Sequence, residues 1–274
     1  MIPPTSHPGS ASLFAGNVAD RPEPEGAAYT PGVKELRLDG KTALVTGGAR
    51  RVGRAISREL ASAGARVMIH HHSSPEAAEQ LAEEIGGGAR VLTADLRDAE
   101  ACEHLLAEAG PLDVLVNNAA DFGKRPFVDT DDAAWESMLA LNLHAPRRLC
   151  RGFARAGRPG VIVNILDIAA QHAWSGYAAY CVSKAGLHML TRVLAIELAP
   201  SVRVCGVAPG VAEFPDSMTD AERERVLARI PQGRAGTPEE VADVVRFLCA
   251  GPTYLTGLVV PVDGGRAAGL PGPL

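Results

Sequence analysis

Short apolar runs alternate with longer segments of helical periodicity along most of the chain. The apolar runs show no polar alternation, which is typical of parallel strands that helices cover on both faces. Seven runs are predicted to be strands: 42–46, 66–70, 90–93, 113–117, 161–165, 202–206 and 258–260. Six segments are predicted to be helices: 51–63, 75–85, 99–109, 131–156, 176–198 and 237–250. Right-handed crossovers between such units predict an α/β fold, a single Rossmann-like doubly wound parallel sheet.

The first 36 residues differ in composition from the rest of the chain. They hold six prolines and show neither helical nor strand periodicity. Because proline fixes φ and removes a backbone donor, residues 1–36 are predicted to be a flexible tail. Residues 37–274 form one series of βα units without an internal repeat. They are predicted to form one domain, since a single α/β sheet accommodates this length.

Composition and charge exclude several classes of protein. Hydrophobic residues make up 46% of the chain and charged residues 22%, which excludes wholesale disorder. The net charge of −5 and the lack of a long basic run argue against a nucleic-acid partner. Five cysteines without a CxxC pair suggest neither a disulfide framework nor a zinc site. With no apolar stretch long enough for a bilayer span and no export signal, we expect a soluble cytoplasmic protein without membrane partners.

The first predicted strand ends in a glycine-rich turn, Thr46–Gly53, and an amphipathic helix follows at once. Backbone N–H groups and the positive end of a helix dipole meet at such a turn, where a pyrophosphate can bind. Gly47 permits the turn and Gly53 permits close packing of the helix. A tight turn without a ligand is the alternative, because a glycine-rich loop alone is weak evidence.

The end of the second predicted strand distinguishes between the two nicotinamide cofactors. NAD needs a carboxylate there for its ribose hydroxyls, and this chain has none. The segment His70–Ser74 offers imidazoles and hydroxyls instead, and Arg51 lies in the neighbouring turn. Such groups accommodate a 2′-phosphate, so NADP(H) is favoured. Three consecutive histidines also suggest a metal site, but successive side chains on a strand point to opposite faces, so we expect no metal.

Polar residues also follow the third and fourth predicted strands. Asp95 comes after the third strand, where its carboxylate can bond the adenine. Asn118 and Ala119 come directly after the fourth strand. An asparagine in that place is often only a turn former, so each of these positions is weak evidence by itself.

Tyr180 and Lys184 are four residues apart in a predicted helix and therefore share one face. A free tyrosine has a pKa near 10, and a nearby ammonium stabilises the phenolate and lowers that pKa. Tyr180 is thus predicted to act as an acid that Lys184 tunes. The alternative is a chance pair on a surface helix, which would be the default if the pair stood alone.

Five motifs stand in a fixed order along the chain. They are TGxxxxxG from Thr46, Asn-Asn-Ala-Ala from Asn117, Tyr-x-x-x-Lys from Tyr180, Pro209-Gly210, and Val-Asp-Gly-Gly from Val262. Over about residues 40–268 this order resembles the short-chain dehydrogenase/reductases. The resemblance implies hydride transfer from a nicotinamide. It also implies a homotetramer that forms through the helices predicted at 131–156 and 176–198.

The resemblance assigns roles to individual residues. Tyr180 is the implied proton donor, Lys184 bonds the nicotinamide ribose, and the backbone carbonyl of Asn142 holds a water in a proton relay. The implied cofactor-binding residues are Gly47, Arg51, Val52, Gly53, His70, His72, Ser73, Ser74, Asp95, Leu96, Asn118, Ala119, Tyr180, Lys184, Pro209 and Gly210.

Two departures from the common family pattern resemble pteridine reductases. Arg51 stands where most members have glycine, and Asp167 stands where most have the serine that bonds the substrate carbonyl. Phe122 matches the aromatic residue that stacks a pterin against the nicotinamide in those enzymes. Ser73 departs from them, because they have an arginine there for the 2′-phosphate. The substrate-binding residues implied are Arg51, Phe122, Asp167 and Tyr180.

The leading interpretation is therefore an NADPH-dependent reductase of a pterin-like heterocycle, converting a dihydropterin to a tetrahydropterin. Asp167 fits a heterocycle with N–H groups better than a plain ketone oxygen, because two acceptor oxygens would otherwise face each other. The alternatives are a reductase of ketones or 3-oxoacyl thioesters, and a non-catalytic nicotinamide sensor or scaffold. The charged helical segment Glu213–Ile230 occupies the place of the family's substrate lid.

Overall fold

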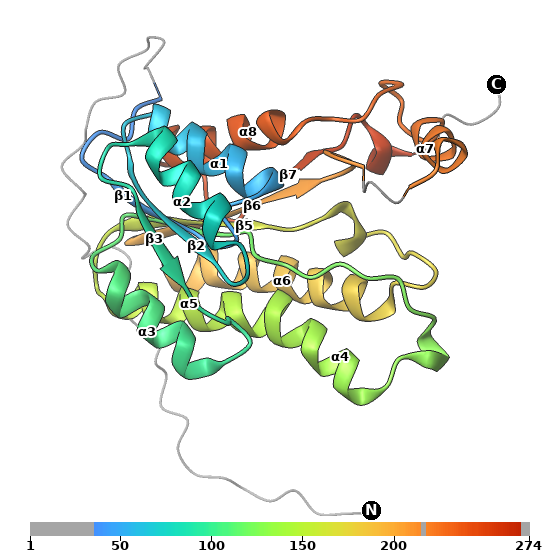
Figure 1. Ribbon diagram of the computed structural model, residues 1–274, viewed down its shortest axis with the longest axis horizontal. Helices are drawn as coiled ribbons and strands as arrows, with labels where there is room; N and C mark the ends of the chain where they lie inside the picture. Colours follow the sequence, from blue (N-terminus) through green and yellow to red (C-terminus); the bar gives the residue numbers. More distant parts are fainter. Residues whose placement is uncertain (1–35, 215–217, 270–274) are drawn as a thin grey trace, which may run out of the picture. The chain divides into compact units, whose positions relative to one another are not determined.

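A computed structural model describes residues 36–214 and 218–269 (Figure 1). The tail predicted at residues 1–36 lies outside the described residues, apart from residue 36. Seven strands form one parallel sheet in the order β3-β2-β1-β4-β5-β6-β7, which confirms the predicted doubly wound architecture. The strands are β1 Thr42–Val45, β2 Arg66–His71, β3 Arg90–Thr93, β4 Val114–Asn117, β5 Gly160–Ile165, β6 Val202–Pro209 and β7 Val259–Val262.

Helices cover both faces of the sheet (Figure 1). One apolar core lies between the sheet and α1, α2 and α8, and a second lies between the sheet and α3, α5 and the end of α6. The continuous apolar strands follow from this two-sided burial. The helices are α1 Arg51–Ser62, α2 Pro75–Ile85, α3 Ala99–Ala109, α4 Asp132–Leu139, α5 Ala145–Arg155, α6 Ala178–Glu197, α7 Asp220–Leu227 and α8 Pro238–Ala250. Within the described residues no helix has the length and apolarity that a bilayer crossing requires.

The helix predicted at 131–156 contains a π-helical turn. Without a gap it consists of α4, the π-helical turn η3 (Ala140–His144), and α5. Pro146 lies in the first turn of α5, where its ring nitrogen carries no hydrogen to donate to the carbonyl of Asn142 four residues earlier. The remaining strand and helix boundaries agree with the predictions to within a few residues, the largest difference being the extension of β6 to Pro209.

The strand order reverses between β1 and β4, and the carboxyl ends of these strands open a crevice there. Thr46, directly after β1, joins the two loops at that edge. Its hydroxyl accepts hydrogen bonds from the backbone N–H groups of Asn118 (2.9 Å) and Ala119 (3.0 Å). The side-chain amide of Asn118 donates back to the carbonyl oxygens of Thr46 (2.9 Å) and Gly47 (3.1 Å). The glycine-rich turn and the loop after β4 therefore form one unit.

Gly53 sets how closely α1 approaches this unit. A Cβ at this position would lie 2.0 Å from the carbonyl oxygen of Gly47 and 2.6 Å from the side-chain nitrogen of Asn118. We expect Gly53→Ala to lower the free energy of unfolding by about 1–3 kcal/mol, because α1 must move away from the turn. Gly123→Ala is the matched control, since a Cβ there has no heavy atom within 4 Å and the change should leave stability within about 0.5 kcal/mol. Urea unfolding of both variants measures the difference, and equal midpoints would contradict the close packing.

Candidate active site

A groove of about 390 Å³ runs along the carboxyl ends of β1, β2, β3 and β4. Twelve of the residues predicted to bind the cofactor line it: Gly47, Arg51, Val52, Gly53, His70, His72, Ser73, Ser74, Asp95, Leu96, Asn118 and Ala119. Arg97 and Leu141 also line the groove and were not predicted. Only the folded sheet brings them there, since neither stands in a recognisable motif. The groove is one site assembled from the loops that follow four strands.

The amino end of α1 faces this groove with free donors. Arg50, which precedes the helix, makes no side-chain hydrogen bond to it, so the first backbone N–H groups have no side-chain cap. Gly47 has a φ of 60° and Arg51 a φ of 49°, both in the left-handed region. Arg51 thus keeps a backbone conformation that glycine adopts more readily, although the glycine itself is absent. Its exposed guanidinium pairs with Glu213 at 3.4 Å.

His70 has a different role from the one predicted. Its Nδ1 accepts a hydrogen bond from the N–H of Gly47 (3.1 Å), and its Nε2 lies 3.1 Å from the carbonyl oxygen of Ala94. Because a carbonyl only accepts, Nε2 carries the proton and the ring is neutral. Burial lowers the pKa of His70 to about 4. Both ring nitrogens are therefore engaged with backbone, and His70 holds the glycine-rich turn rather than offering a donor to a phosphate.

The other residues at the end of β2 leave donors at the groove. His72 and Ser73 are exposed, and the Nε2 atom of His72 lies 4.0 Å from a carboxylate oxygen of Asp95. The ring of His71 is buried between the N–H of Ser74 (3.3 Å) and the hydroxyl of Thr93 (2.9 Å). Among the described residues no cluster of three or more possible metal ligands occurs.

Asp167, Tyr180 and Lys184 meet at the carboxyl end of β5. The hydroxyl of Tyr180 donates a hydrogen bond to Asp167 at 2.8 Å, and the other carboxylate oxygen accepts the N–H of Ala169 at 2.8 Å. Burial raises the pKa of Asp167 above the ordinary range of a carboxyl. The helix α6 brings Tyr180 and Lys184 to one face, as their spacing predicts.

The structure contradicts the predicted lowering of the tyrosine pKa. Burial, followed by the neighbouring Asp167 carboxylate, raises the pKa of Tyr180 well above 10. The Lys184 ammonium instead donates to the carbonyl oxygen of Ile165 at 2.9 Å and lies 5.8 Å from the centre of the Tyr180 ring. Burial lowers the pKa of Lys184 to about 8. Tyr180 therefore keeps its proton at neutral pH and donates it in a hydrogen bond to Asp167.

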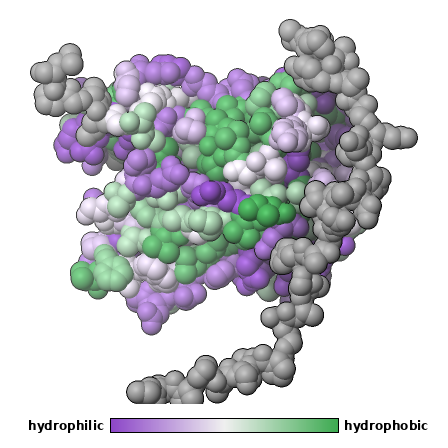
Figure 2. Space-filling model, turned by 180° about the vertical axis from the view of Figure 1, so that it is seen from behind, coloured by the Kyte–Doolittle hydropathy of each residue, from purple (hydrophilic) through white to green (hydrophobic). Residues whose placement is uncertain are grey.

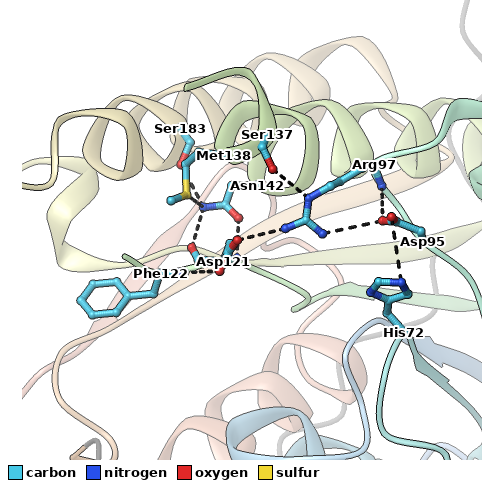
Figure 3. Close-up of polar contacts among 9 residues, drawn as sticks. All are labelled: His72, Asp95, Arg97, Asp121, Phe122, Ser137, Met138, Asn142 and Ser183. Carbon is cyan, nitrogen blue, oxygen red and sulfur yellow. Dashed lines mark hydrogen bonds and ion pairs between the residues drawn. The ribbon is translucent and has the colours of Figure 1, made fainter. Parts of the chain in front are cut away.

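Asn142 is buried in the π-helical turn, with its side chain fixed on the loop after β4 (Figure 3). Its Oδ1 accepts the N–H of Asp121 (2.8 Å), and its Nδ2 donates to the carbonyl oxygen of Asp121 (3.0 Å) and to the hydroxyl of Ser183 (3.1 Å). The side chain thus serves the fold. Pro146 has no N–H to donate to the backbone carbonyl of Asn142, and the water relay predicted for Asn142 stays a prediction.

Aromatic rings form a wall beside Tyr180. Phe122 contacts Tyr180 edge-to-face at 4.9 Å and stacks on Tyr177 at 5.0 Å. Trp174 lies 6.5 Å from Tyr180, and the Arg266 guanidinium lies 5.4 Å from the Trp174 ring. Phe122 was predicted to lie at this site and does so with about half of its surface exposed. Trp174, Tyr177 and Arg266 were not predicted, although the cluster of aromatic residues just before Tyr180 was a signal for the first two.

Pro209 and Gly210 end β6 on the opposite side of the site. The N–H of Gly210 donates to the carbonyl oxygen of Val262 at 2.9 Å. A Cβ on Gly210 would lie 2.9 Å from Asp263, so the close approach of these two loops requires glycine. In the predicted lid, Glu213–Ile230, the helix α7 spans Asp220–Leu227, and residues 215–217 lie outside the described residues.

Residues 47–267 match a family model described as enoyl-(acyl carrier protein) reductase. The match spans the glycine-rich turn, the Asp167–Tyr180–Lys184 site and the loops after β6 and β7. The chain belongs to the short-chain dehydrogenase/reductase family. The fold and the family that the five motifs indicated are thereby confirmed, and the protein is an oxidoreductase.

Three relatives are similar to this family member over nearly their whole length. L-xylulose reductase of Bos taurus is 38% identical over 244 residues, covering 85% of this chain and 99% of that protein. The 3-oxoacyl-[acyl-carrier-protein] reductase FabG of Aquifex aeolicus is 38% identical over 245 residues, covering 84% and 99%. A solved structure from Beutenbergia cavernae, assigned as an NAD(P)-dependent gluconate 5-dehydrogenase and holding NADP at low occupancy, is 35% identical, with a TM-score of 0.81 and coverage of 86% and 100%. None of these three is a pteridine reductase.

The neutral state of His70 predicts a specific acid sensitivity. The folded pKa of about 4 lies below the unfolded value of 6.5, so the stabilising contribution is complete above pH 6.5 and is lost as pH falls toward 4. Over that interval we expect wild type to lose about 3 kcal/mol relative to His70→Gln, which cannot take up the proton. His104→Gln on the exposed side of α3 is the control. Denaturant unfolding at several pH values measures the difference, and parallel curves for wild type and His70→Gln would contradict the assignment.

Proposed function

We propose that the protein is an NADPH-dependent reductase of a pterin-like heterocycle, converting a dihydropterin to a tetrahydropterin. The observation that carries this proposal is the 2.8 Å hydrogen bond from the Tyr180 hydroxyl to the Asp167 carboxylate. It places an acceptor beside the proton donor at the position where the family commonly has a serine hydroxyl. The substrate must therefore present a donor to this side of the site.

The residues of the groove fit NADP(H). Gly47 and Gly53 let the turn pack closely at the uncapped end of α1, where backbone N–H groups can bind a pyrophosphate. The exposed His72, Ser73 and Arg51 side chains offer donors to a 2′-phosphate. The structural relative that holds NADP supports the same assignment. When bound, the nicotinamide supplies a hydride.

Asp167 and Tyr180 would manage the proton that accompanies the hydride. A serine hydroxyl can donate to a ketone oxygen, whereas an ionised carboxylate only accepts and so suits a ring N–H. Because burial raises the pKa of Asp167, its carboxyl holds a proton to higher pH than an ordinary aspartic acid. In that form it can reprotonate the Tyr180 phenolate after the hydroxyl has given its proton to the substrate. Lys184 has a pKa of about 8 and so remains largely charged at neutral pH, where it opposes the build-up of negative charge on this pair.

The aromatic wall supports a flat substrate. The ring of Phe122 is half exposed, stacks on Tyr177 and packs edge-to-face on Tyr180, so its exposed half can contact a flat heterocycle next to the proton donor. Stacking would fix the plane of the substrate, while Asp167 would fix its orientation within that plane.

A reductase of ketones or 3-oxoacyl thioesters is the second candidate. The names of the sequence relatives favour it, since L-xylulose reductase and 3-oxoacyl-[acyl-carrier-protein] reductase both denote reduction of a carbonyl group. The two candidates differ in what Asp167 must do. A ketone oxygen needs a protonated Asp167 or no carboxyl group at this position. A ring N–H can instead donate to the ionised carboxylate.

The substitution Asp167→Ser separates the two candidates. We expect wild type to oxidise NADPH with a dihydropterin and not with an acetoacetyl thioester. Asp167→Ser should lower kcat/KM for the dihydropterin about 10- to 100-fold, the value of one hydrogen bond to a charged group, and should raise activity on the thioester. Tyr180→Phe is the control for general acid catalysis and should lower kcat at least about 100-fold on the substrate that wild type turns over. Turnover of the thioester alone by wild type would refute the pterin assignment.

We also propose a cytoplasmic homotetramer. All five cysteines are free thiols, which suits a reducing compartment.

Green apolar patches separated by polar residues are visible on the surface in Figure 2. Among the described residues, α6 exposes Val182, Met189, Val193 and Ile196. Met189 and Val193 also line a groove of about 670 Å³ beside the π-helical turn, a shape that a second copy could fill.

Light scattering tests this assembly. We expect a mass four times that of one chain at micromolar concentration, and a lower mass for Val193→Arg, because a charge on α6 would be buried without a partner. Val128→Arg is the matched control, since Val128 lies on the short 3-10 turn Phe127–Asp129 and is 89% exposed. A monomer mass for wild type would refute the tetramer.

A further inference from the structure

A chain of polar contacts runs from the cofactor groove to the aromatic wall (Figure 3). It begins at His72 and Asp95 at the carboxyl ends of β2 and β3, passes through Arg97, and ends at Asp121 and Phe122 after β4. Neither Arg97 nor Asp121 takes part in the proposed hydride or proton transfer. Both lie outside the motifs that identify the family.

Arg97 is held on several sides. Its backbone N–H donates to Asp95 at 3.0 Å, its Nε donates to the hydroxyl of Ser137 on α4 at 3.1 Å, and its carbonyl oxygen accepts from Arg148 on α5 at 3.2 Å. The free end of the guanidinium then donates to Asp121 at 2.9 Å. With about a third of its side chain exposed, Arg97 has one geometry rather than the many of a surface arginine.

Asp121 transmits that geometry to the substrate side. One carboxylate oxygen accepts from Arg97, and the other accepts the N–H of the next residue, Phe122, at 3.1 Å. The backbone N–H and carbonyl of Asp121 are both bonded by the buried side chain of Asn142. Both the main chain and the side chain of Asp121 are therefore held in place, and Asp121 in turn holds the backbone N–H of Phe122.

We propose that Arg97 is a positioning residue, and that its ion pair with Asp121 holds the Phe122 ring against Tyr180. Arg97 touches neither the proton donor nor the aromatic wall, and acts through Asp121. Loss of the pair would free the loop after Asn118 to move, and the 4.9 Å contact between the two rings would open. This change would weaken substrate binding and leave proton transfer unaffected, because Tyr180 and Asp167 are held by other contacts. The substrate half of this inference rests on the proposed function.

The test compares Arg97→Gln, Asp121→Asn and the double variant. At saturating NADPH we expect each single variant to raise KM for a dihydropterin about 3- to 5-fold, the effect of one partly exposed ion pair, with kcat within twofold of wild type. The double variant should be no worse than the weaker single variant, because both changes remove one interaction. Arg97→Lys should restore part of the loss. Arg54→Gln is the matched control, because it breaks an ion pair between Arg54 on α1 and Glu84 on α2 that is about as exposed as the Arg97–Asp121 pair. This variant should leave KM unchanged.

Crystal structures of wild type and Arg97→Gln give a readout that needs no substrate. We expect the separation of the Phe122 and Tyr180 rings to grow beyond 4.9 Å, or the Phe122 ring to lose its order, in the variant. An unchanged ring contact, an unchanged KM, or additive effects of the two single variants would each overturn the proposal. If wild type turns over only an acetoacetyl thioester, the pterin assignment fails, while the ring separation and the KM for the thioester still decide the role of Arg97.

Discussion

The hydrogen bonds between Thr46 and the loop after β4 are the constraint on which the rest of the site depends. Parallel strands leave their carboxyl-end loops as separate segments, and the reversal of strand order would otherwise leave a gap between β1 and β4. One hydroxyl accepts two backbone N–H groups of the loop after β4, and the amide of Asn118 donates back to two carbonyl oxygens. His70 extends the same unit to β2 through the N–H of Gly47. The loops that carry the groove therefore move as one body.

The second constraint is the burial of ionisable groups at the site of Asp167, Tyr180 and Lys184. Tyr180 and Lys184 are each about 95% buried or more, and Asp167 lies against them. An isolated charge in such a place is costly, so burial shifts the pKa of each group toward its neutral form. The backbone supplies further partners, with the carbonyl of Ile165 accepting from Lys184 and the N–H of Ala169 donating to Asp167. The pKa values of all three groups are therefore set by their shared burial.

The π-helical turn between α4 and α5 connects the loop after β4 to the buried site. Pro146 cannot bond the carbonyl of Asn142, and the π-helical turn turns the Asn142 side chain toward the loop after β4. The same side chain reaches the hydroxyl of Ser183, which in turn bonds the carbonyl of Tyr180. The π-helical turn thus connects α6, which carries Tyr180, to the loop after β4.

The sequence by itself determined the sheet, the order of the βα units, the family and most of the groove, because apolar runs, glycine turns and the Tyr180–Lys184 spacing are local signals. Tertiary structure alone decided the protonation chemistry and several partners. The pKa of Tyr180 rises where spacing predicted a fall, since that pKa depends on burial and on Asp167, thirteen residues away in the chain. His70 binds backbone and not phosphate, because its surroundings come from β1 and β3. Arg97 and Asp121 meet across 24 positions of sequence, and only the folded sheet places them side by side.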